Sequence, residues 1–306
     1  LLMTAFETRP EVFTDGQLNI PESGNGIPDY LDEALWSAAG WEYLQEADGA
    51  VRLGAESHRH PYGIYLASDD PLPYWTYNRC PIHTARVAGI FAQAARLVEP
   101  YDAYRSEILR QRAIKAYEYA VNNGVDESVG GPIMYAASEL FRLTGEEQYR
   151  EMVHATWEAH RPTWSALPTI YWRAIQWTSS FTLDTQPIMW DYLTGYLNSE
   201  YADSTHVAAA RNNLMVAPSQ ILHDIESRYA HRNAKPAGWS PTWGMATCVG
   251  QFLFRIYAAM QLNVLDPVEY QAAVDAISLS ADYVLGCNPL GRTWITGLGS
   301  RPPMTP

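Results

Sequence analysis

Cysteine is scarce in this sequence, with Cys80, Cys248 and Cys287 as the only three among 306 residues. Three cysteines are too few for a disulfide-stapled scaffold, and their positions do not have the spacing of zinc ligands. We therefore expect each of them to be a small buried apolar residue rather than a ligand or a nucleophile.

Basic charge is also in short supply, because 21 Lys and Arg face 34 Asp and Glu, for a formal charge of −13 and a pI near 5.0. Binding to nucleic acid or to an anionic membrane depends on a basic face, so the charge argues against both partners. No apolar run reaches the roughly 18 residues of a membrane span. No signal peptide opens the sequence, but it starts inside an apparent amphipathic helix, so we expect residues upstream of Leu1.

Common catalytic motifs are missing as well. The sequence contains no GxSxG elbow, P-loop, GxGxxG or HExxH motif, so serine-nucleophile, phosphate-transfer, dinucleotide and zincin chemistry have no support. Asp69 and Asp70 are adjacent in a proline-flanked loop, which is typical of solvent-facing carboxylates. Asp29 and Asp32 share one face at the start of a predicted helix, where capping and compensation of the helix dipole are the favoured roles.

Aromatic residues are abundant, with 11 Trp, 20 Tyr and 7 Phe. Their rings stack on the C–H faces of sugars, but they also pack well in a helical core, and composition alone does not separate these roles. Trp75 lies in the stretch Pro73-Tyr74-Trp75-Thr76-Tyr77, which is too rich in proline for a helix and could line a cleft. His58 and His60 lie in a polar loop without a third metal ligand at a suitable spacing, so ligand contact and a surface position both stay open.

Apolar residues recur at helical spacing along most of the chain, while strand signals are weak. No repeat of about 34 to 47 residues indicates a solenoid, so the pattern favours an all-α toroid of helical hairpins over a helical solenoid. Gly145 is expected to end one helix just before the next begins. The predicted helices are Ile27–Glu46, Ile82–Val98, Tyr104–Asn122, Pro132–Thr144, Glu146–His160, Gln186–Leu197, Thr205–Arg228, Trp243–Leu262 and Pro267–Leu285.

Three stretches carry a family resemblance: NIPESGNGIPDYLDEALW at residues 19–36, AASELFRLTG at 136–145 and YVLGCNPLGRTWITGLG at 283–299. Together they closely resemble glycoside hydrolase family 9, the cellulase family with an (α/α)6 barrel. The resemblance spans essentially the whole chain. It implies one all-α catalytic domain over residues 1–306, which we expect to be an (α/α)6 barrel that is incomplete at both ends.

The resemblance implies hydrolysis of β-1,4-glucosidic bonds with inversion, in cellulose, related β-glucans or cello-oligosaccharides. The family's catalytic carboxylates map to no residue here and are expected upstream of Leu1 and downstream of Pro306. The resemblance points to Trp243 as a sugar-stacking indole, to Tyr135 as the replacement of a family tryptophan, and to His58 or His60 as a sugar contact. With Trp75, these residues form the expected substrate-binding set.

The resemblance also implies a secreted or periplasmic location and a glucan partner, and it is compatible with an Ig-like or carbohydrate-binding module outside this chain. It requires no cofactor or catalytic metal. A structural calcium ion occurs in relatives, but no clustered acidic loop in this sequence identifies a site for one.

Two other interpretations stay open. One is a non-catalytic carbohydrate-binding (α/α) toroid or an inactive fragment, because the catalytic carboxylates are missing from the sequence. The other is an exo-acting glucosaminidase on chitosan oligosaccharides, because the sugar-contact positions depart from the cellulase pattern.

Overall fold

The computed structural model describes residues 2–59, 69–165, 202–205, 218–227 and 265–295, with short pieces at 253, 256–257, 259–260, 263 and 298–299. Contacts divide the chain into two compact units. Unit 1 comprises Leu1–Pro162 and Thr182–Tyr201, and unit 2 comprises Thr163–Phe181 and Ala202–Pro306. The expectation of one domain over residues 1–306 stays a prediction.

Helices make up most of the described part of unit 1 and lie close to the predicted ranges. α4 begins after Asp102, whose carboxylate accepts a hydrogen bond from the Arg105 backbone N–H at 2.9 Å. α5 ends at Gly145, which has a φ of 71° and confirms the predicted stop. In order, the helices are α1 (Leu2–Thr8), η1 (Pro10–Val12), α2 (Asp29–Leu44), α3 (Pro81–Val98), α4 (Ala103–Asn122), η3 (Glu127–Val129), α5 (Gly131–Thr144) and α6 (Glu147–Ser165), the last of which runs past the end of this unit at Pro162.

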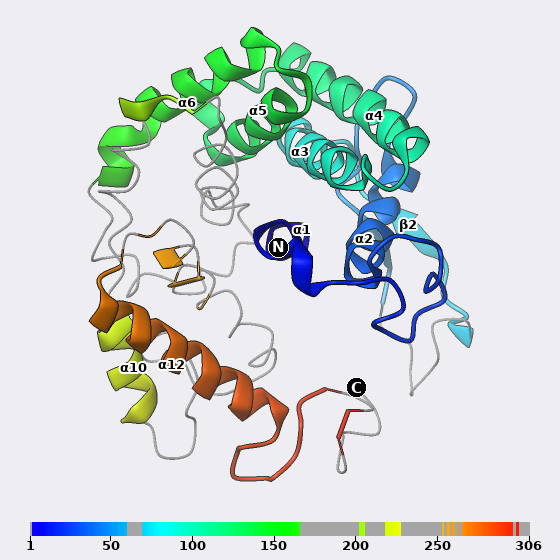
Figure 1. Cartoon of the computed structure of the whole chain (residues 1–306). Helices are drawn as coiled ribbons and strands as arrows, with labels where there is room; N and C mark the ends of the chain where they lie inside the picture. The colour runs from blue at the N-terminus through cyan, green and yellow to red at the C-terminus, as the bar shows by residue number, and fades with distance from the viewer. Residues whose placement is uncertain are drawn as a thin grey trace. The chain divides into compact units, whose positions relative to one another are not determined.

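α3 is the central helix of this group, with α4 and α5 both packed against it (Figure 1). Its buried face includes Ala88, Ala92 and Ala95, which have no exposed surface, and Phe91, which is among the largest fully buried side chains. Small side chains at a helix contact permit a short distance between helix axes. The apolar spacing that predicts this helix therefore also places its alanine face in the core.

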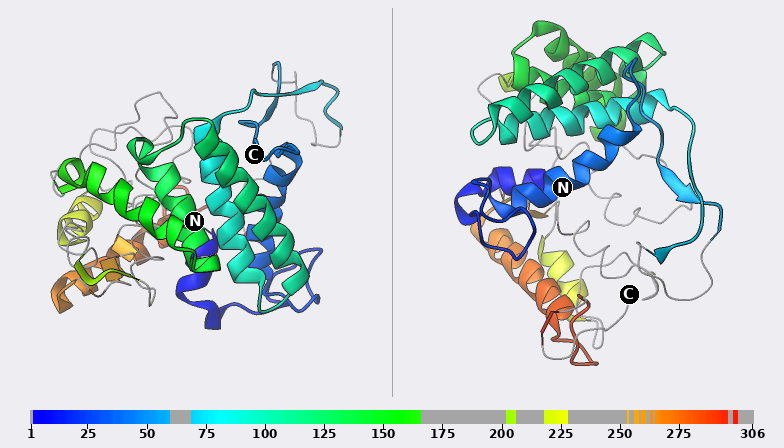
Figure 2. Two further views of the ribbon diagram at one scale, coloured as in Figure 1. Left: turned by 90° about the horizontal axis from the view of Figure 1, so that it is seen from above. Right: turned by 90° about the vertical axis from the view of Figure 1, so that its right-hand side faces the viewer.

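A short antiparallel ribbon joins α2 to α3. β1 (Ala55–Ser57) pairs with β2 (Tyr74–Thr76) so that Glu56 lies opposite Trp75. Figure 2 shows the ribbon extending away from the helices of unit 1 in both views. The proline-rich stretch around Trp75 is therefore a strand, which the weak strand signals do not predict.

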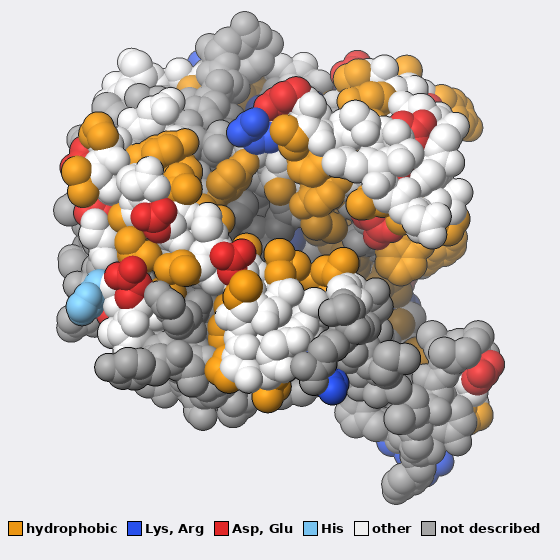
Figure 3. Space-filling view, turned by 60° about the horizontal axis from the view of Figure 1, so that its bottom comes forward, with side chains coloured by type: hydrophobic (Ala, Val, Ile, Leu, Met, Phe, Trp, Pro, Cys, Tyr) orange, Lys and Arg blue, Asp and Glu red, His pale blue; other side chains and the backbone are white. Residues whose placement is uncertain are grey.

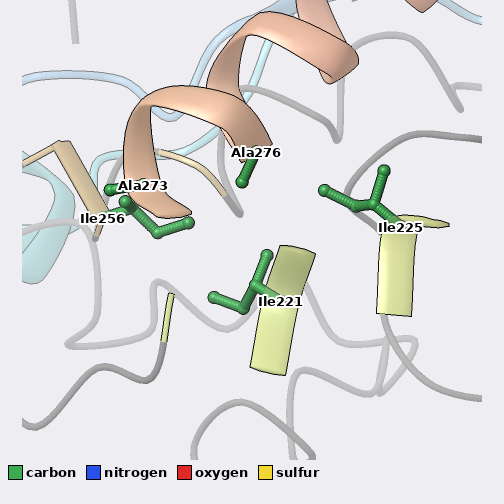
Figure 4. Packing of buried hydrophobic residues seen from close by; sticks show 5 residues of the cluster. All are labelled: Ile221, Ile225, Ile256, Ala273 and Ala276. Carbon is green, nitrogen blue, oxygen red and sulfur yellow. The ribbon is translucent and has the colours of Figure 1, made fainter. Parts of the chain in front are cut away.

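In unit 2, α10 (Pro218–Glu226) packs against α12 (Pro267–Leu285). Ile221 and Ile225 of α10 point toward the α12 alanines Ala273 and Ala276, and Ile256 completes the cluster (Figure 4). α12 begins after Asp266, whose carboxylate accepts hydrogen bonds from two backbone N–H groups, and its bounds match the predicted range.

Some predicted helices fall wholly or partly outside the residues that the structure describes. Gln186–Leu197 lies outside the described residues, as do the first half of Thr205–Arg228 and much of Trp243–Leu262. These ranges stay predictions.

Asn288 organises the turn that follows α12. Its side-chain N–H group donates to the carbonyls of Tyr283 at 2.8 Å and Arg292 at 2.6 Å, and its oxygen accepts from the backbone N–H of Leu290 at 3.1 Å. Cys287 in this turn is exposed, because the turn lies at the surface and places the thiol in solvent. The expectation that Cys287 is buried is therefore wrong.

Candidate functional site

The loop that leads into α2 is built around the Asp29 carboxylate. This carboxylate has no exposed surface and accepts hydrogen bonds from the backbone N–H of Gly16 at 2.9 Å, the N–H of Leu18 at 2.6 Å and the Ser23 hydroxyl at 2.9 Å. Asp15 makes the matching set of contacts by accepting from the N–H groups of Gly24 at 2.6 Å and Gly26 at 2.8 Å. The backbone N–H groups of this loop thus donate to two carboxylates, whereas in a helix or sheet they would donate to backbone carbonyls.

The predicted capping role of Asp29 is wrong. Pro28 occupies the N-cap position of α2, and no side chain there accepts a capping hydrogen bond. Asp29 instead turns back toward the preceding loop, while its place in the first helical turn agrees with compensation of the helix dipole. Burial raises the pKa of Asp29, but the hydrogen bonds from Gly16, Leu18 and Ser23 outweigh burial and hold the pKa below its usual value.

The pKa of Asp32 is shifted in the opposite direction from that of Asp29. It is 7% exposed, and burial raises its pKa, with the nearby carboxylates of Glu22, Asp29 and Asp15 raising it further. A side-chain hydrogen bond with Asn25 opposes this shift. The two aspartates three residues apart are therefore not equivalent, because hydrogen bonds favour the charged form of Asp29 whereas burial and like charges favour the neutral form of Asp32.

The β1–β2 ribbon presents exposed aromatic rings. Trp75 is 63% exposed and Tyr74 is 60% exposed. The Tyr74 hydroxyl donates to Asp70 at 2.7 Å, and the Tyr77 hydroxyl donates to Glu56, so both tyrosines are held at their polar tips. Rings anchored in this way keep their flat faces free for a ligand.

The predicted histidines lie beside this ribbon in sequence. His58 directly follows β1 and is exposed, whereas His60 lies outside the described residues. The Ser57 hydroxyl donates to the Arg59 carbonyl at 2.8 Å, which shapes the turn around His58. The structure thus brings His58 and Trp75 into the same ribbon region, and their contact with sugar stays a prediction.

Tyr135 lies in the core of unit 1. Its ring is 4% exposed, and its hydroxyl donates to the side-chain oxygen of Gln93 at 2.8 Å. The ring packs so tightly on Gly89 that a Cβ added to this glycine would lie 2.5 Å from it. Little of the ring is open to a ligand among the described residues, so the sugar-stacking role implied for Tyr135 stays a prediction. Trp243 lies outside the described residues.

A buried ion-pair network, which the sequence does not predict, joins three helices. Arg96 of α3 contacts Glu7 of α1 at 2.9 Å and Glu139 of α5 at 2.8 Å. Arg142 contacts Glu139 at 2.9 Å and also Glu7. Only the spacing of three between Glu139 and Arg142 is visible in the sequence, because the other pairs join positions far apart along the chain.

The network shifts the pKa of the acid in α1. Burial would raise the pKa of Glu7, but the charges of Arg96 and Arg142 and their hydrogen bonds lower it to about 2. Gln93 extends the network by donating to Thr4 at 3.2 Å and to Glu7 at 3.4 Å. Tyr135, Gln93 and Glu7 therefore form one connected polar path from α5 to α1.

No metal site is found in the described parts of the chain, where no group of three or more His, Cys, Asp or Glu side chains could hold an ion. No helix among the described residues is long and apolar enough to cross a membrane. Figure 3 shows acidic and hydrophobic side chains scattered over one face, with few basic ones and no basic patch among the described residues there.

Three comparisons with known proteins agree. The sequence profile of glycosyl hydrolase family 9 matches residues 2–306. The chain is 26% identical over 336 residues to a cellulose 1,4-beta-cellobiosidase of Acetivibrio thermocellus, an alignment that covers 96% of this chain and 36% of that protein. It is 25% identical over 310 residues to endoglucanase C of Cellulomonas fimi, covering 94% of this chain and 26% of that protein.

Solved structures give the same result. A metagenome-derived glycoside hydrolase family 9 endoglucanase is similar with a TM-score of 0.75 and 27% identity, over 99% of this chain and 54% of that one. The family 9 endoglucanase J30 supports the fold with a TM-score of 0.68 at 23% identity, over 99% of this chain and 56% of that one. The chain thus spans about half the length of these structures and a smaller share of the two curated relatives.

Helices dominate the described residues, and the solved structures that match the chain are helical barrels, so its fold class is all-α, an (α/α)6 barrel. The chain belongs to glycosyl hydrolase family 9.

Proposed function

We propose that the full-length protein containing this chain hydrolyses β-1,4-glucosidic bonds in cellulose, a related β-glucan or a cello-oligosaccharide. The observation that carries the proposal is the family match over residues 2–306. Curated relatives named as a cellobiosidase and as endoglucanases support the substrate class. A secreted location follows from this function, because polymeric glucans lie outside the cell.

The proposed reaction inverts the configuration at the anomeric carbon. A protonated carboxyl donates its proton to the leaving oxygen, while a carboxylate on the opposite side of the ring removes a proton from the attacking water. We assign neither role to a described residue, because the oxygens of Asp29 are held by three hydrogen bonds and the family resemblance places the catalytic carboxylates on no residue of this chain. Both carboxylates are expected in parts of the full-length protein outside this chain.

The role proposed for this chain is to position the substrate. Exposed rings such as Trp75 stack on sugar faces, and His58 beside them can donate a hydrogen bond to a hydroxyl. The polar path from Tyr135 through Gln93 to Glu7 holds α1 against α3 and α5. Fixed supporting helices matter because a misplaced sugar loses the geometry required for displacement.

Replacement of two tryptophans tests the positioning role. Trp75→Ala and Trp243→Ala in the full-length protein are expected to raise KM or lower kcat on cello-oligosaccharides by about tenfold, through loss of ring stacking. Trp75→Phe is the matched control, since it keeps an aromatic face and should retain most of the activity.

Thermal unfolding of the same variants separates binding from stability. Trp75 is mostly exposed, so Trp75→Ala is expected to leave the Tm nearly unchanged. Wild-type kinetics in both alanine variants would contradict the substrate-binding assignment. Absence of hydrolysis by the wild-type protein on every β-glucan tested would contradict the proposed function.

A further inference from the structure

A hollow of about 490 Å³ lies between the residues that directly follow α2 and the part of α4 from Tyr104 to Lys115. Its volume falls within the range of roughly 300–1,000 Å³ that is usual for small-molecule sites. Among the described residues, none of the expected substrate-binding set lines it. Its lining combines a tyrosine ring, two amides and charges of both signs, from Gln45, Tyr104, Glu107, Gln111, Arg112 and Lys115.

Tyr104 is the aromatic member of this lining. It lies in the first turn of α4 and is 79% exposed, so its ring contributes little to the core of unit 1. A tyrosine ring offers a flat apolar face, and its hydroxyl both donates and accepts hydrogen bonds. A sugar ring has the complementary features, with C–H groups on its faces and hydroxyls around its edge.

The polar groups around this ring are already held in place. Gln45 donates to the Arg112 carbonyl at 2.9 Å and accepts from the Arg112 guanidinium at 2.9 Å. Gln111 donates to Glu107 at 2.7 Å on the same helix. Side chains fixed before binding lose little conformational entropy when a ligand arrives.

The charges of the lining select the kind of ligand. Glu46 and Glu107 carry negative charge, while Arg112 and Lys115 carry positive charge, so the lining is balanced, and Glu46 and Arg112 are each paired with an opposite charge outside it. A balanced set favours neither an anion nor a cation, and the formal charge of −13 on the chain opposes a polyanion. A neutral ligand with many hydroxyls can donate to the carboxylates and accept from the cations.

We propose that this hollow binds a short segment of a neutral β-linked glucan, with a sugar ring stacked on Tyr104. The choice of a glucan as the neutral ligand rests on the proposed function. A polymer held here and hydrolysed by the same protein remains at a high local concentration, which strengthens its overall binding.

The test measures the Kd of the full-length protein for insoluble cellulose, together with hydrolysis of soluble cellotetraose. Tyr104→Ala is expected to weaken cellulose binding roughly three- to tenfold, the loss of one aromatic stacking contact. Gln111→Ala is the second variant and is expected to weaken binding in the same direction. Cellotetraose hydrolysis and the Tm should remain at wild-type values in both.

Tyr43→Ala is the matched control. Tyr43 is 90% exposed on α2 and does not line the hollow, so this variant should bind cellulose within twofold of the wild type. Wild-type binding by Tyr104→Ala, or an equal loss in Tyr43→Ala, would overturn the proposal. A lowered Tm in Tyr104→Ala would also overturn it, because the residue would then be structural.

The two proposals fail in different ways. If the wild-type protein hydrolyses no β-glucan, the proposed function fails, and the hollow is then tested directly by titration with cellohexaose. Binding of cellohexaose that depends on Tyr104 supports the site, and binding that is unaffected by Tyr104→Ala overturns it.

Discussion

The Asp29 carboxylate determines how the loop before α2 folds. Its two oxygens accept from backbone groups 13 and 11 residues upstream and from the Ser23 hydroxyl, which closes the loop onto the helix. A buried acceptor with several N–H donors cannot be replaced by a group that presents donors of its own. Asp29, which the sequence predicts to be a helix cap, instead holds the preceding loop against the start of α2.

Asp29→Asn is therefore expected to destabilise the protein by roughly 1–3 kcal/mol, because an amide N–H group would face backbone N–H groups. Urea unfolding followed by circular dichroism measures the change. Asp70→Asn is the control, since Asp70 also accepts from a backbone N–H and a hydroxyl but at a less buried position, and it should cost less. Equal stability of Asp29→Asn and wild type would contradict the role of Asp29.

Glu7 determines how one part of the stability depends on pH. Its folded pKa of about 2 lies below the ordinary value of about 4.3. A lowered folded pKa stabilises the folded state above the ordinary pKa, and this contribution is lost as pH falls toward 2. Acid should therefore weaken the attachment of α1 progressively between about pH 5 and pH 2.

Glu7→Gln is expected to destabilise the protein at pH 7 by roughly 2–3 kcal/mol, somewhat less than the roughly 3–5 kcal/mol of fully buried pairs. It should also flatten the fall in Tm between pH 5 and pH 3, because the titrating group is gone. Calorimetry at these pH values measures both effects. Glu147→Gln, which removes an exposed pair with Arg150, should change little, and an unaltered acid profile in Glu7→Gln would contradict the network's role.

At the scale of helices, the close approach of α3 and α5 depends on a glycine. The ring of Tyr135 occupies the space where any larger residue at position 89 would place its Cβ. The same ring is anchored by its hydrogen bond to Gln93, so it cannot move aside freely. The packing of these two helices is thus specified by a small residue and a large one together.

Gly89→Ala is expected to lower the stability by about 1–3 kcal/mol, because α3 and α5 must separate to admit the methyl group. In a Tyr135→Leu background, the same substitution should cost less, since the ring that it meets has been removed. A double-mutant cycle measured by urea unfolding reports this coupling. Additive effects of the two substitutions would contradict the contact.

The helices could be predicted from sequence, but several contacts between them could not. Gly145 and Pro267 mark helix ends through local backbone preferences, and the structure confirms those ends. The ion pair between Glu7 and Arg142 joins residues 135 positions apart, and no local pattern reveals it. The strands of the ribbon are three residues each, too short to show an alternating pattern.

For the whole molecule, the family resemblance predicts a reaction and a substrate class, whereas the side-chain chemistry alone predicts neither. The three stretches at residues 19–36, 136–145 and 283–299 point to the family that the profile then matches. In the structure, two of these stretches form a loop or turn held by side-chain hydrogen bonds: the loop bound by Asp29 and the turn bound by Asn288. These two stretches therefore determine the local fold before α2 and after α12.

We propose that the full-length protein is an inverting hydrolase of β-1,4-glucans, and the anomer that it releases tests this activity. The most direct measurement is time-resolved proton NMR of cellotetraose hydrolysis, recorded before the sugar anomers equilibrate. The new reducing ends are expected to appear first as the α-anomer, because one displacement by water inverts the β-linkage. Initial formation of the β-anomer, or no cleavage of cellotetraose or cellulose, would contradict it.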